Sequence, residues 1–170
     1  MASSLRFQLS SSSSMPMTLA ADDSSWMFYV GLTPTWQQLK VNLRVNLMGY
    51  DYSGYGASAG KPSESNTYAD IEAVYQCLQT EYGVSQEDLI LYGQSVGSGP
   101  TLHLASKLPR LRGVVLHSGI LSGLRVLCHV KFTFCCDIYK NINKIKKVKC
   151  PVLVIHGTGR LMLVELLAWK

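Results

Sequence analysis

The sequence contains no long hydrophobic run, although hydrophobic residues make up 47% of its 170 residues. The best stretch, Leu161 to Trp169, is too short for the roughly 18 apolar residues that a spanning helix needs, and it contains Glu165. Charged residues are also few, at 16%. This composition argues against a membrane-spanning protein and predicts one globular domain with a buried core.

Cysteine is present, but its spacing matches neither a zinc site nor a disulfide framework. No Cys-x-x-Cys pair occurs, and the adjacent Cys135 and Cys136 could form a disulfide only with strain. An odd number of cysteines without a secretory signal favours reduced thiols in a reducing compartment, with no metal and no cofactor. The five cysteines are Cys77, Cys128, Cys135, Cys136 and Cys150.

Acidic residues are missing from the amino-terminal segment up to Asp22, where serine is abundant. This composition cannot build a packed element. It lacks the apolar core of a secretory signal but is similar to a serine-rich transit peptide. We therefore expect a disordered or transit-peptide-like tail over residues 1–25 and a single domain over 26–170. The predicted location is cytoplasmic, with a plastid as the alternative.

Positive charge is concentrated in one segment, "KNINKIKKVK", within a chain of net charge +5. Such a segment can attract an acidic membrane surface, so peripheral membrane contact is one interpretation. The other is a solvated helix face that leads into a strand. No nucleic-acid motif accompanies the charge. The lysines are Lys140, Lys144, Lys146, Lys147 and Lys149.

From Val45 onward, short apolar runs alternate with amphipathic stretches, which is typical of a parallel α/β sheet with flanking helices. The long segment between the last two strands, 118–150, exceeds an ordinary crossover and predicts a small helical cap. Asn66 or Thr67 should cap the first helix, and Asp70 and Glu72 should favour its positive end. The predicted strands are 45–50, 89–92, 113–117 and 151–157, and the predicted helices are 68–82 and 96–107.

The segment "LILYGQSVGSG" places Gly93-Gln94-Ser95-Val96-Gly97 between a predicted strand and a predicted helix. This is the arrangement of a nucleophile elbow, in which a strained turn exposes the serine hydroxyl above the sheet. The glycines leave room for the neighbouring strand and helix. The N–H of Val96 can stabilise an oxyanion. Ser95 is thus a candidate nucleophile, and a glycine-rich turn without chemistry is the alternative.

Several segments together resemble one subgroup of the α/β-hydrolase superfamily, called α/β-hydrolase domain-containing protein seventeen, in wording similar to its plant members. They are "VNLMGYDYSGYGASAGKPSE", "DIEAVYQCL", "LILYGQSVGSGPTLHLAS", "LRGVVLHSGILSG" and "CPVLVIHGT", within about residues 44–158. The resemblance implies an α/β-hydrolase fold and a serine hydrolase whose animal relatives remove palmitate from cysteines of membrane-associated proteins. It also implies that Ser95 is the nucleophile and that Val96 supplies an oxyanion N–H.

The remaining members of a catalytic triad are not evident in the sequence. A serine needs a histidine as base and an acid that orients it. The position that matches the acid is Arg160, Glu165 lies too far along, and the chain stops at Lys170 before the expected histidine. His117 is the nearest substitute. The other histidines, His103, His129 and His156, are interpreted as structural or surface residues.

The sequence therefore predicts an incomplete α/β-hydrolase fold with impaired or no catalysis. A weakly active esterase and a non-catalytic acyl-binding or protein-interaction module are the alternatives. The resemblance also implies a His-Gly-Asn-type loop with a second oxyanion donor; Ala20-Ala21-Asp22 is interpreted as a remnant of that loop, and no His-Gly precedes it. Asp51 is interpreted as a structural carboxylate of its own glycine-rich loop.

The resemblance to α/β-hydrolases implies a strand before the oxyanion loop at the centre of the sheet, and the local candidate for it is Trp26 to Val30, which is aromatic and β-branched as a strand should be. We predict that this strand pairs in parallel between the strands at 45–50 and 89–92. The competing interpretation is one irregular helix over 26–43.

Overall fold

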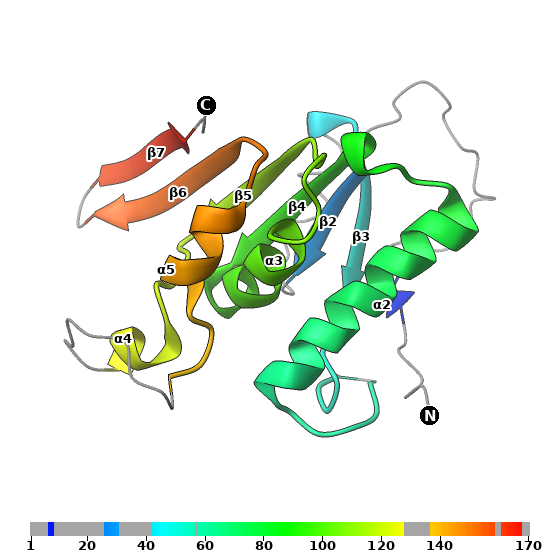
Figure 1. The fold of residues 1–170 in the computed structure, drawn as a ribbon, viewed down its shortest axis with the longest axis horizontal. Helices are drawn as coiled ribbons and strands as arrows, with labels where there is room; N and C mark the ends of the chain where they lie inside the picture. Colours follow the sequence, from blue (N-terminus) through cyan, green and yellow to red (C-terminus); the bar gives the residue numbers. More distant parts are fainter. Residues whose placement is uncertain are drawn as a thin grey trace.

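A computed structural model describes residues 7–8, 26–30, 42–56, 58–127, 137–158 and 161–167. Its centre is one seven-stranded sheet in the order β1-β3-β2-β4-β5-β6-β7 (Figure 1). The five inner strands run parallel, and β1 and β7 join the two edges antiparallel. The strands are β1 (Phe7–Gln8), β2 (Trp26–Val30), β3 (Asn46–Tyr50), β4 (Leu89–Gln94), β5 (Gly113–His117), β6 (Val152–Thr158) and β7 (Leu161–Leu167). The predicted α/β class with a mostly parallel sheet is confirmed.

Strand β2 occupies the central position that the sequence predicts for it. Met27 lies opposite Leu47 of β3 on one side and opposite Ile90 of β4 on the other, both in parallel register. A strand with two neighbours offers no free edge, so its backbone groups are used on both sides. The competing interpretation, a helix at these residues, is wrong.

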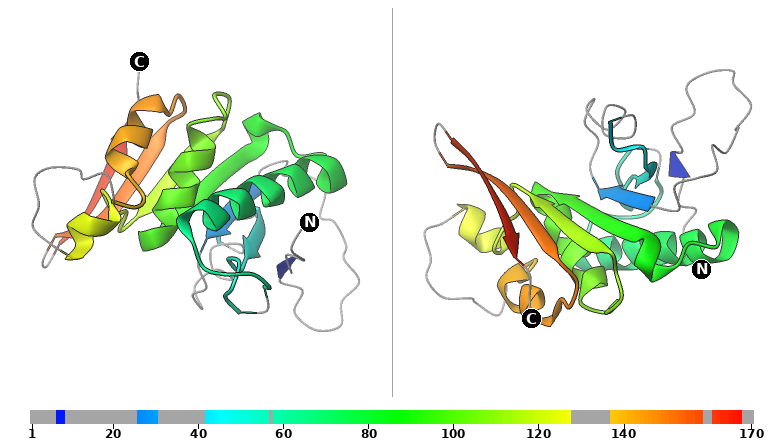
Figure 2. Two further views of the ribbon diagram at one scale, coloured as in Figure 1. Left: turned by 60° about the horizontal axis from the view of Figure 1, so that its bottom comes forward. Right: turned by 90° about the horizontal axis from the view of Figure 1, so that it is seen from above.

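Helices α2 (Glu64–Tyr82), α3 (Ser98–Ala105) and α5 (Asn141–Lys144) lie on the same face of the sheet (Figure 2). The main core forms between these helices and the sheet, and each fully buried aliphatic side chain there contributes roughly 1.5–3 kcal/mol. Its most buried large members are Met48, Ile71, Val74, Leu78, Leu89, Leu91, Val114 and Val152.

The amino end of α2 differs from the prediction. The helix begins at Glu64, and its cap is Ser63, whose Oγ accepts a hydrogen bond from the N–H of Asn66 at 3.1 Å. Neither Asn66 nor Thr67 is the cap, because Ser63 is the last residue with extended backbone. Glu64 is the acidic residue of the first turn. The carboxyl end is as predicted, since Gly83 takes the left-handed conformation, with φ of 64°.

The predicted roles of Asp70 and Glu72 at the helix end are therefore wrong. Both lie at least one full turn inside α2, beyond the reach of its positive end. Asp70 is buried and accepts hydrogen bonds from Ser53, while Glu72 binds His103 and Lys107 on the helix surface.

The segment between β5 and β6 contains α4 (Gly123–Leu127), α5 and a short 3₁₀ turn, η3 (Ile145–Lys147). These pieces are helical, as predicted for a cap, but residues 128–136 lie outside the described residues. That gap includes His129 and the cysteines at 128, 135 and 136. Whether this segment covers a substrate stays a prediction.

The two ends of the chain add pairings that the sequence did not predict. Phe7 and Gln8, within the predicted tail, pair with Tyr50 and Gly49 of β3, and the remainder of residues 1–25 lies outside the described part. At the other end, β7 folds back along β6 over its whole length. No helix in the described ranges has the length and apolarity that crossing a bilayer requires.

Candidate active site

The turn after β4 is built as a nucleophile elbow. Strand β4 ends at Gln94, the 3₁₀ turn η2 (Ser95–Gly97) follows, and α3 begins at Ser98. Ser95 has φ of 50°, a left-handed conformation that costs a non-glycine residue on the order of 1 kcal/mol. Ser95 is exposed at the carboxyl end of a parallel strand, the edge at which α/β folds bind their ligands.

Gly93 is required by the packing under this turn. A Cβ there would lie 2.6 Å from Oγ1 of Thr101 and 2.8 Å from the carbonyl oxygen of Gly97. Real Cβ atoms do not approach other atoms this closely, so strand and helix can meet here only over a glycine. The sequence-based reason for a glycine at this position is confirmed.

The hydroxyl of Ser98 is the centre of a buried polar cluster directly below the turn. It donates to the carbonyl oxygen of Ser95 at 2.6 Å and accepts from the N–H of Ile120 at 3.2 Å. It also accepts from Nδ2 of Asn141 at 3.1 Å, and Nδ2 donates a second bond to the carbonyl oxygen of Ile120 at 2.9 Å. Ser98 is 0% exposed and Asn141 is 2% exposed, so water does not compete for these bonds. Neither residue was predicted from the sequence, because no motif or pattern marks it.

The nearest histidine in the sheet is engaged elsewhere. His117 lies beside Gln94 in the β4–β5 register, but its Nδ1 is 2.7 Å from the hydroxyl of Tyr92. Alternate residues of a strand point to opposite faces, which puts Tyr92 and His117 on the face away from the α2–α3 core. Among the described residues, no hydrogen bond joins a histidine to the Ser95 hydroxyl.

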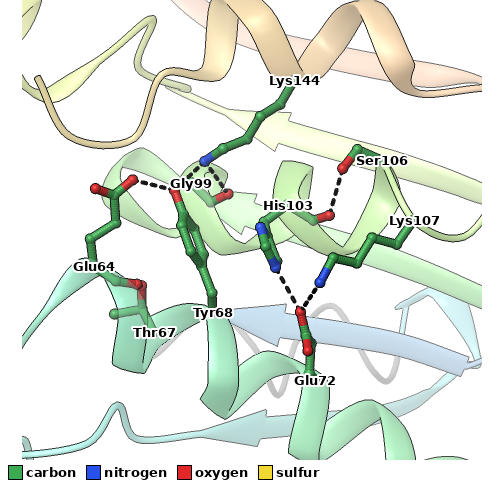
Figure 3. A network of polar contacts seen from close by, with 9 residues as sticks. All are labelled: Glu64, Thr67, Tyr68, Glu72, Gly99, His103, Ser106, Lys107 and Lys144. Atoms are coloured by element: carbon green, nitrogen blue, oxygen red, sulfur yellow. Dashed lines mark hydrogen bonds and ion pairs between the residues drawn. The ribbon is translucent and has the colours of Figure 1, made fainter. Parts of the chain in front are cut away.

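The other described histidines are structural or exposed. Nε2 of His103 lies 2.7 Å from Oε1 of Glu72, and its ring stacks on Tyr68 with centroids 4.1 Å apart (Figure 3). Burial lowers the pKa of His103, whereas the hydrogen bond from Lys107 lowers the pKa of Glu72. His156 is exposed on β6. These placements agree with the interpretation of His103 and His156 from the sequence.

The candidate acids lie away from Ser95. In the ladder from β4 to β7, Gly93 is level with Leu116, Val154 and Glu165, so three strand spacings, roughly 14 Å, separate the backbones of Gly93 and Glu165. Arg160 lies outside the described residues. The carboxylate of Asp51 packs on Gly56, where a Cβ would be 2.3 Å from Oδ2, in keeping with a role in its own loop.

The predicted basic patch divides into two parts. Lys144 turns inward, where its Nζ contacts the hydroxyl of Tyr68, lies 3.3 Å from the carbonyl oxygen of Gly99 and sits 4.3 Å from the centroid of the Tyr68 ring (Figure 3). Tyr68 in turn donates to Glu64. Burial lowers the pKa of Lys144 to about 8. Lys146, Lys147 and Lys149 are exposed, and Lys140 is half-buried.

Comparison with known proteins identifies the class to which this sheet and turn belong. No protein-family model matches the chain. The fold is similar to an α/β hydrolase of Vibrio vulnificus, with a TM-score of 0.58 and 18% identity over 78% of this chain and 56% of that one. An esterase of Pyrococcus furiosus gives a TM-score of 0.58 and 17% identity over 79% and 59%. These two similarities show that the chain has an α/β-hydrolase fold.

The sequence itself is similar to α/β-hydrolase domain-containing protein 17C. The mouse protein is 52% identical over 132 residues, which are 77% of this chain and 39% of the relative. The human protein is 52% identical over 132 residues, 38% of its length. The α/β-hydrolase domain-containing protein aho-3 of Caenorhabditis elegans is 52% identical over 121 residues, 71% of this chain and 36% of that protein. The recognition of subgroup seventeen is confirmed, and the chain spans about two fifths of the length of these relatives.

No group of three histidine, cysteine, aspartate or glutamate side chains that could hold a metal ion occurs within the described part of the chain. The structure brings together Gly93, Gln94, Ser95, Val96 and Gly97 at one turn, and none of the described histidines is hydrogen-bonded to the Ser95 hydroxyl.

Proposed function

We propose that this protein is a serine hydrolase of ester or thioester bonds, with Ser95 as nucleophile and the N–H of Val96 as an oxyanion donor. The observation that carries the proposal is the left-handed backbone of Ser95, with φ of 50°, at an exposed turn between a parallel strand and a helix. A strained non-glycine conformation persists only where the surrounding structure holds it, and such residues cluster at active sites.

The reaction would proceed through a covalent acyl-serine. Oγ of Ser95 attacks the acyl carbonyl and loses its proton to a base, and the carbonyl oxygen takes up the negative charge beside the N–H of Val96. The C–O or C–S bond then breaks, and the alcohol or thiol leaves with a proton. Water releases the acid in the second step.

Turnover by this 170-residue polypeptide should be slow. Serine is a poor nucleophile until a base accepts its proton. Among the described residues, no histidine is hydrogen-bonded to the Ser95 hydroxyl: His117 contacts Tyr92, and His103 contacts Glu72. We therefore propose impaired catalysis for this polypeptide, with binding and oxyanion stabilisation leaving an acceleration of about 10³-fold over water.

The substrate class that we propose is an acyl-protein thioester, such as palmitate on cysteine, which rests on the resemblance to subgroup seventeen. A location at an acidic membrane surface is supported by three exposed lysines, Lys146, Lys147 and Lys149. Lys140, in the same segment, is half-buried. A cytoplasmic, membrane-peripheral location forms part of this proposal. The plastid alternative depends on residues 1–25, most of which lie outside the described residues.

A fluorophosphonate probe tests the nucleophile directly, with mass spectrometry to locate the label. Ser118 is a matched control, because it is also exposed, has φ of 50° and follows the adjacent strand β5. We expect the label on Ser95 in the native protein and in Ser118→Ala, and none in Ser95→Ala. Labelling that survives Ser95→Ala would contradict the proposal.

Hydrolysis of a p-nitrophenyl ester and of a palmitoyl thioester tests turnover. We expect rates near background, with any residual rate abolished by Ser95→Ala. Robust hydrolysis that depends on Ser95 would contradict impaired catalysis while supporting the nucleophile. Binding of a fluorescent acyl ligand without any label on Ser95 would favour the acyl-binding module, which is also favoured because no described histidine is hydrogen-bonded to the Ser95 hydroxyl.

A further inference from the structure

Two side chains far apart in the sequence, Ser98 and Asn141, meet below the turn that carries Ser95. A serine hydroxyl has one hydrogen to donate and two lone pairs that accept. At Ser98 both lone pairs are occupied, one by the N–H of Ile120 and one by Nδ2 of Asn141. The single hydroxyl hydrogen therefore has one remaining direction, toward the carbonyl oxygen of Ser95 at 2.6 Å.

The hydrogen bond to the Ser95 carbonyl also determines the direction of the Val96 N–H. The carbonyl of Ser95 and the N–H of Val96 belong to one planar peptide unit, in which they point in opposite directions. The backbone N–H of Ser98 donates to the same carbonyl oxygen, so that oxygen is held from the helix side by two donors. The N–H of Val96 must then point away from α3, toward the exposed side of the turn.

We infer that Ser98 and Asn141 are positioning residues, which orient the Val96 N–H as an oxyanion donor by holding the Ser95 carbonyl. Asn141 acts through Ser98, because its amide fixes the direction of the Ser98 hydroxyl. The same amide also donates to the carbonyl oxygen of Ile120, which connects the residues after β5 to Asn141. The segment between β5 and β6 thereby controls the geometry at Ser95, although it is distant in the sequence.

Further contacts restrain Asn141 and the residues beside it. The ring of Tyr139 packs on Gly99, where a Cβ would lie 2.2 Å from the ring, and Nζ of Lys144 lies 3.4 Å from Oδ1 of Asn141. The backbone N–H of Asn141 donates to the carbonyl oxygen of Leu121 at 3.0 Å. Both the nitrogen and the oxygen of the Asn141 side-chain amide are thus held, and so is the backbone of the residue. The amide therefore has little freedom to reorient.

The first test measures the order of the Val96 N–H by ¹⁵N relaxation in the full chain, which requires no catalysis. In Ser98→Ala and Asn141→Ala we expect its order parameter to fall from about 0.85, typical of rigid backbone, to below about 0.6. Ser106→Ala is the matched control for Ser98, because the Ser106 hydroxyl also donates to a carbonyl three residues earlier, that of His103. Asn143→Ala, an exposed change on the same helix, is the control for Asn141.

The second test measures the rate of fluorophosphonate labelling at Ser95, and it rests on the proposed function. We expect labelling to slow at least about tenfold in Ser98→Ala and Asn141→Ala, against roughly 10²-fold or more for complete loss of a donor. Both controls should label at the native rate. Asn141→Leu, which is close to asparagine in size but has no hydrogen-bond donor, replaces any alanine variant that does not fold.

The two tests separate this inference from the proposed function. If the variants show reduced order at Val96 but Ser95 is not labelled even in the native protein, the positioning role is supported and the proposal that Ser95 is a nucleophile is contradicted. Native order and a native labelling rate in folded Asn141→Leu overturn the positioning role and leave the nucleophile in place. A loss of unfolding free energy without any change at Val96 also overturns it, because the two residues would then be structural only.

Discussion

The buried carboxylate of Asp70 accepts two hydrogen bonds from Ser53, one from the backbone N–H at 2.8 Å and one from the hydroxyl at 2.6 Å. Ser53 belongs to the glycine-rich loop after β3, and Asp70 lies in the second turn of α2. The pair therefore connects the loop to the helix through groups that water does not reach, since Asp70 is 3% and Ser53 is 5% exposed.

We predict that Asp70→Asn lowers the free energy of unfolding by about 2–3 kcal/mol, because one buried oxygen that accepts becomes an NH₂ that cannot. Asp88→Asn is the matched control, since Asp88 accepts from Ser85 at 2.7 Å in an exposed pair, and we expect it to cost less than about 0.5 kcal/mol. Urea unfolding followed by circular dichroism measures both. Equal effects of the two substitutions would show that burial does not strengthen the Ser53–Asp70 pair.

Met27→Pro should unfold the domain. Proline removes a backbone donor and fixes φ, and β2 lies between β3 and β4 with a neighbour on each side. Phe7→Pro provides the control, because β1 is a two-residue strand at the outer edge of the sheet. We expect a native circular dichroism spectrum for Phe7→Pro and loss of the cooperative thermal transition for Met27→Pro. A folded Met27→Pro protein would be inconsistent with a central β2.

Gly93→Ala should disturb the elbow without any change to Ser95 itself. The added methyl would lie 2.6 Å from Oγ1 of Thr101, and overpacking of this kind costs about 1–3 kcal/mol. At Gly157 a Cβ would meet no atom within 4 Å, so Gly157→Ala should change the free energy of unfolding by less than about 0.5 kcal/mol.

The measurement for this pair is urea unfolding together with fluorophosphonate labelling. We expect Gly93→Ala to lose both stability and labelling rate, because the strand and helix that hold Ser95 must move apart. A Gly93→Ala protein as stable as Gly157→Ala would show that the turn tolerates a methyl group, against the geometry.

The low pKa of Lys144 predicts a pH dependence of stability. Burial lowers this pKa to about 8, so between about pH 8 and the ordinary lysine value near 10.4 the unfolded chain binds a proton that the folded protein does not. Stability from this group therefore rises with pH across that window, and below pH 8 the folded protein bears the full cost of the buried charge.

Urea unfolding at pH 7.5 to 9.5 tests this, with Lys144→Met for comparison. We expect the difference in unfolding free energy, native protein minus Lys144→Met, to increase with pH. The same difference taken with Lys147→Met, a change at an exposed lysine of the same segment, should stay constant. A difference for Lys144→Met that does not change with pH would place its amine in water.

The sequence by itself determined the elements that depend on local pattern. Gly93 and Ser95 identify the turn from the sequence. The packing there requires a residue without a Cβ, and a nucleophile elbow requires an exposed hydroxyl. Residues 26–30 could be assigned to the sheet because their aromatic and β-branched composition suits a strand and the fold leaves one central position to fill. The start of α2 was missed because several polar residues can cap a helix, and only the backbone shows that Ser63 is the last extended one.

The tertiary structure alone decided which distant side chains meet. Nothing in "KNINKIKKVK" distinguishes Asn141 from Asn143, or Lys144 from Lys147, yet one of each pair is packed against α3 and the other is exposed. The return of the chain as β7 was likewise not evident from its apolar composition. The physical reason is that strand and turn formation depends on neighbouring residues, whereas the partner of a buried polar group depends on how separate elements pack around the sheet.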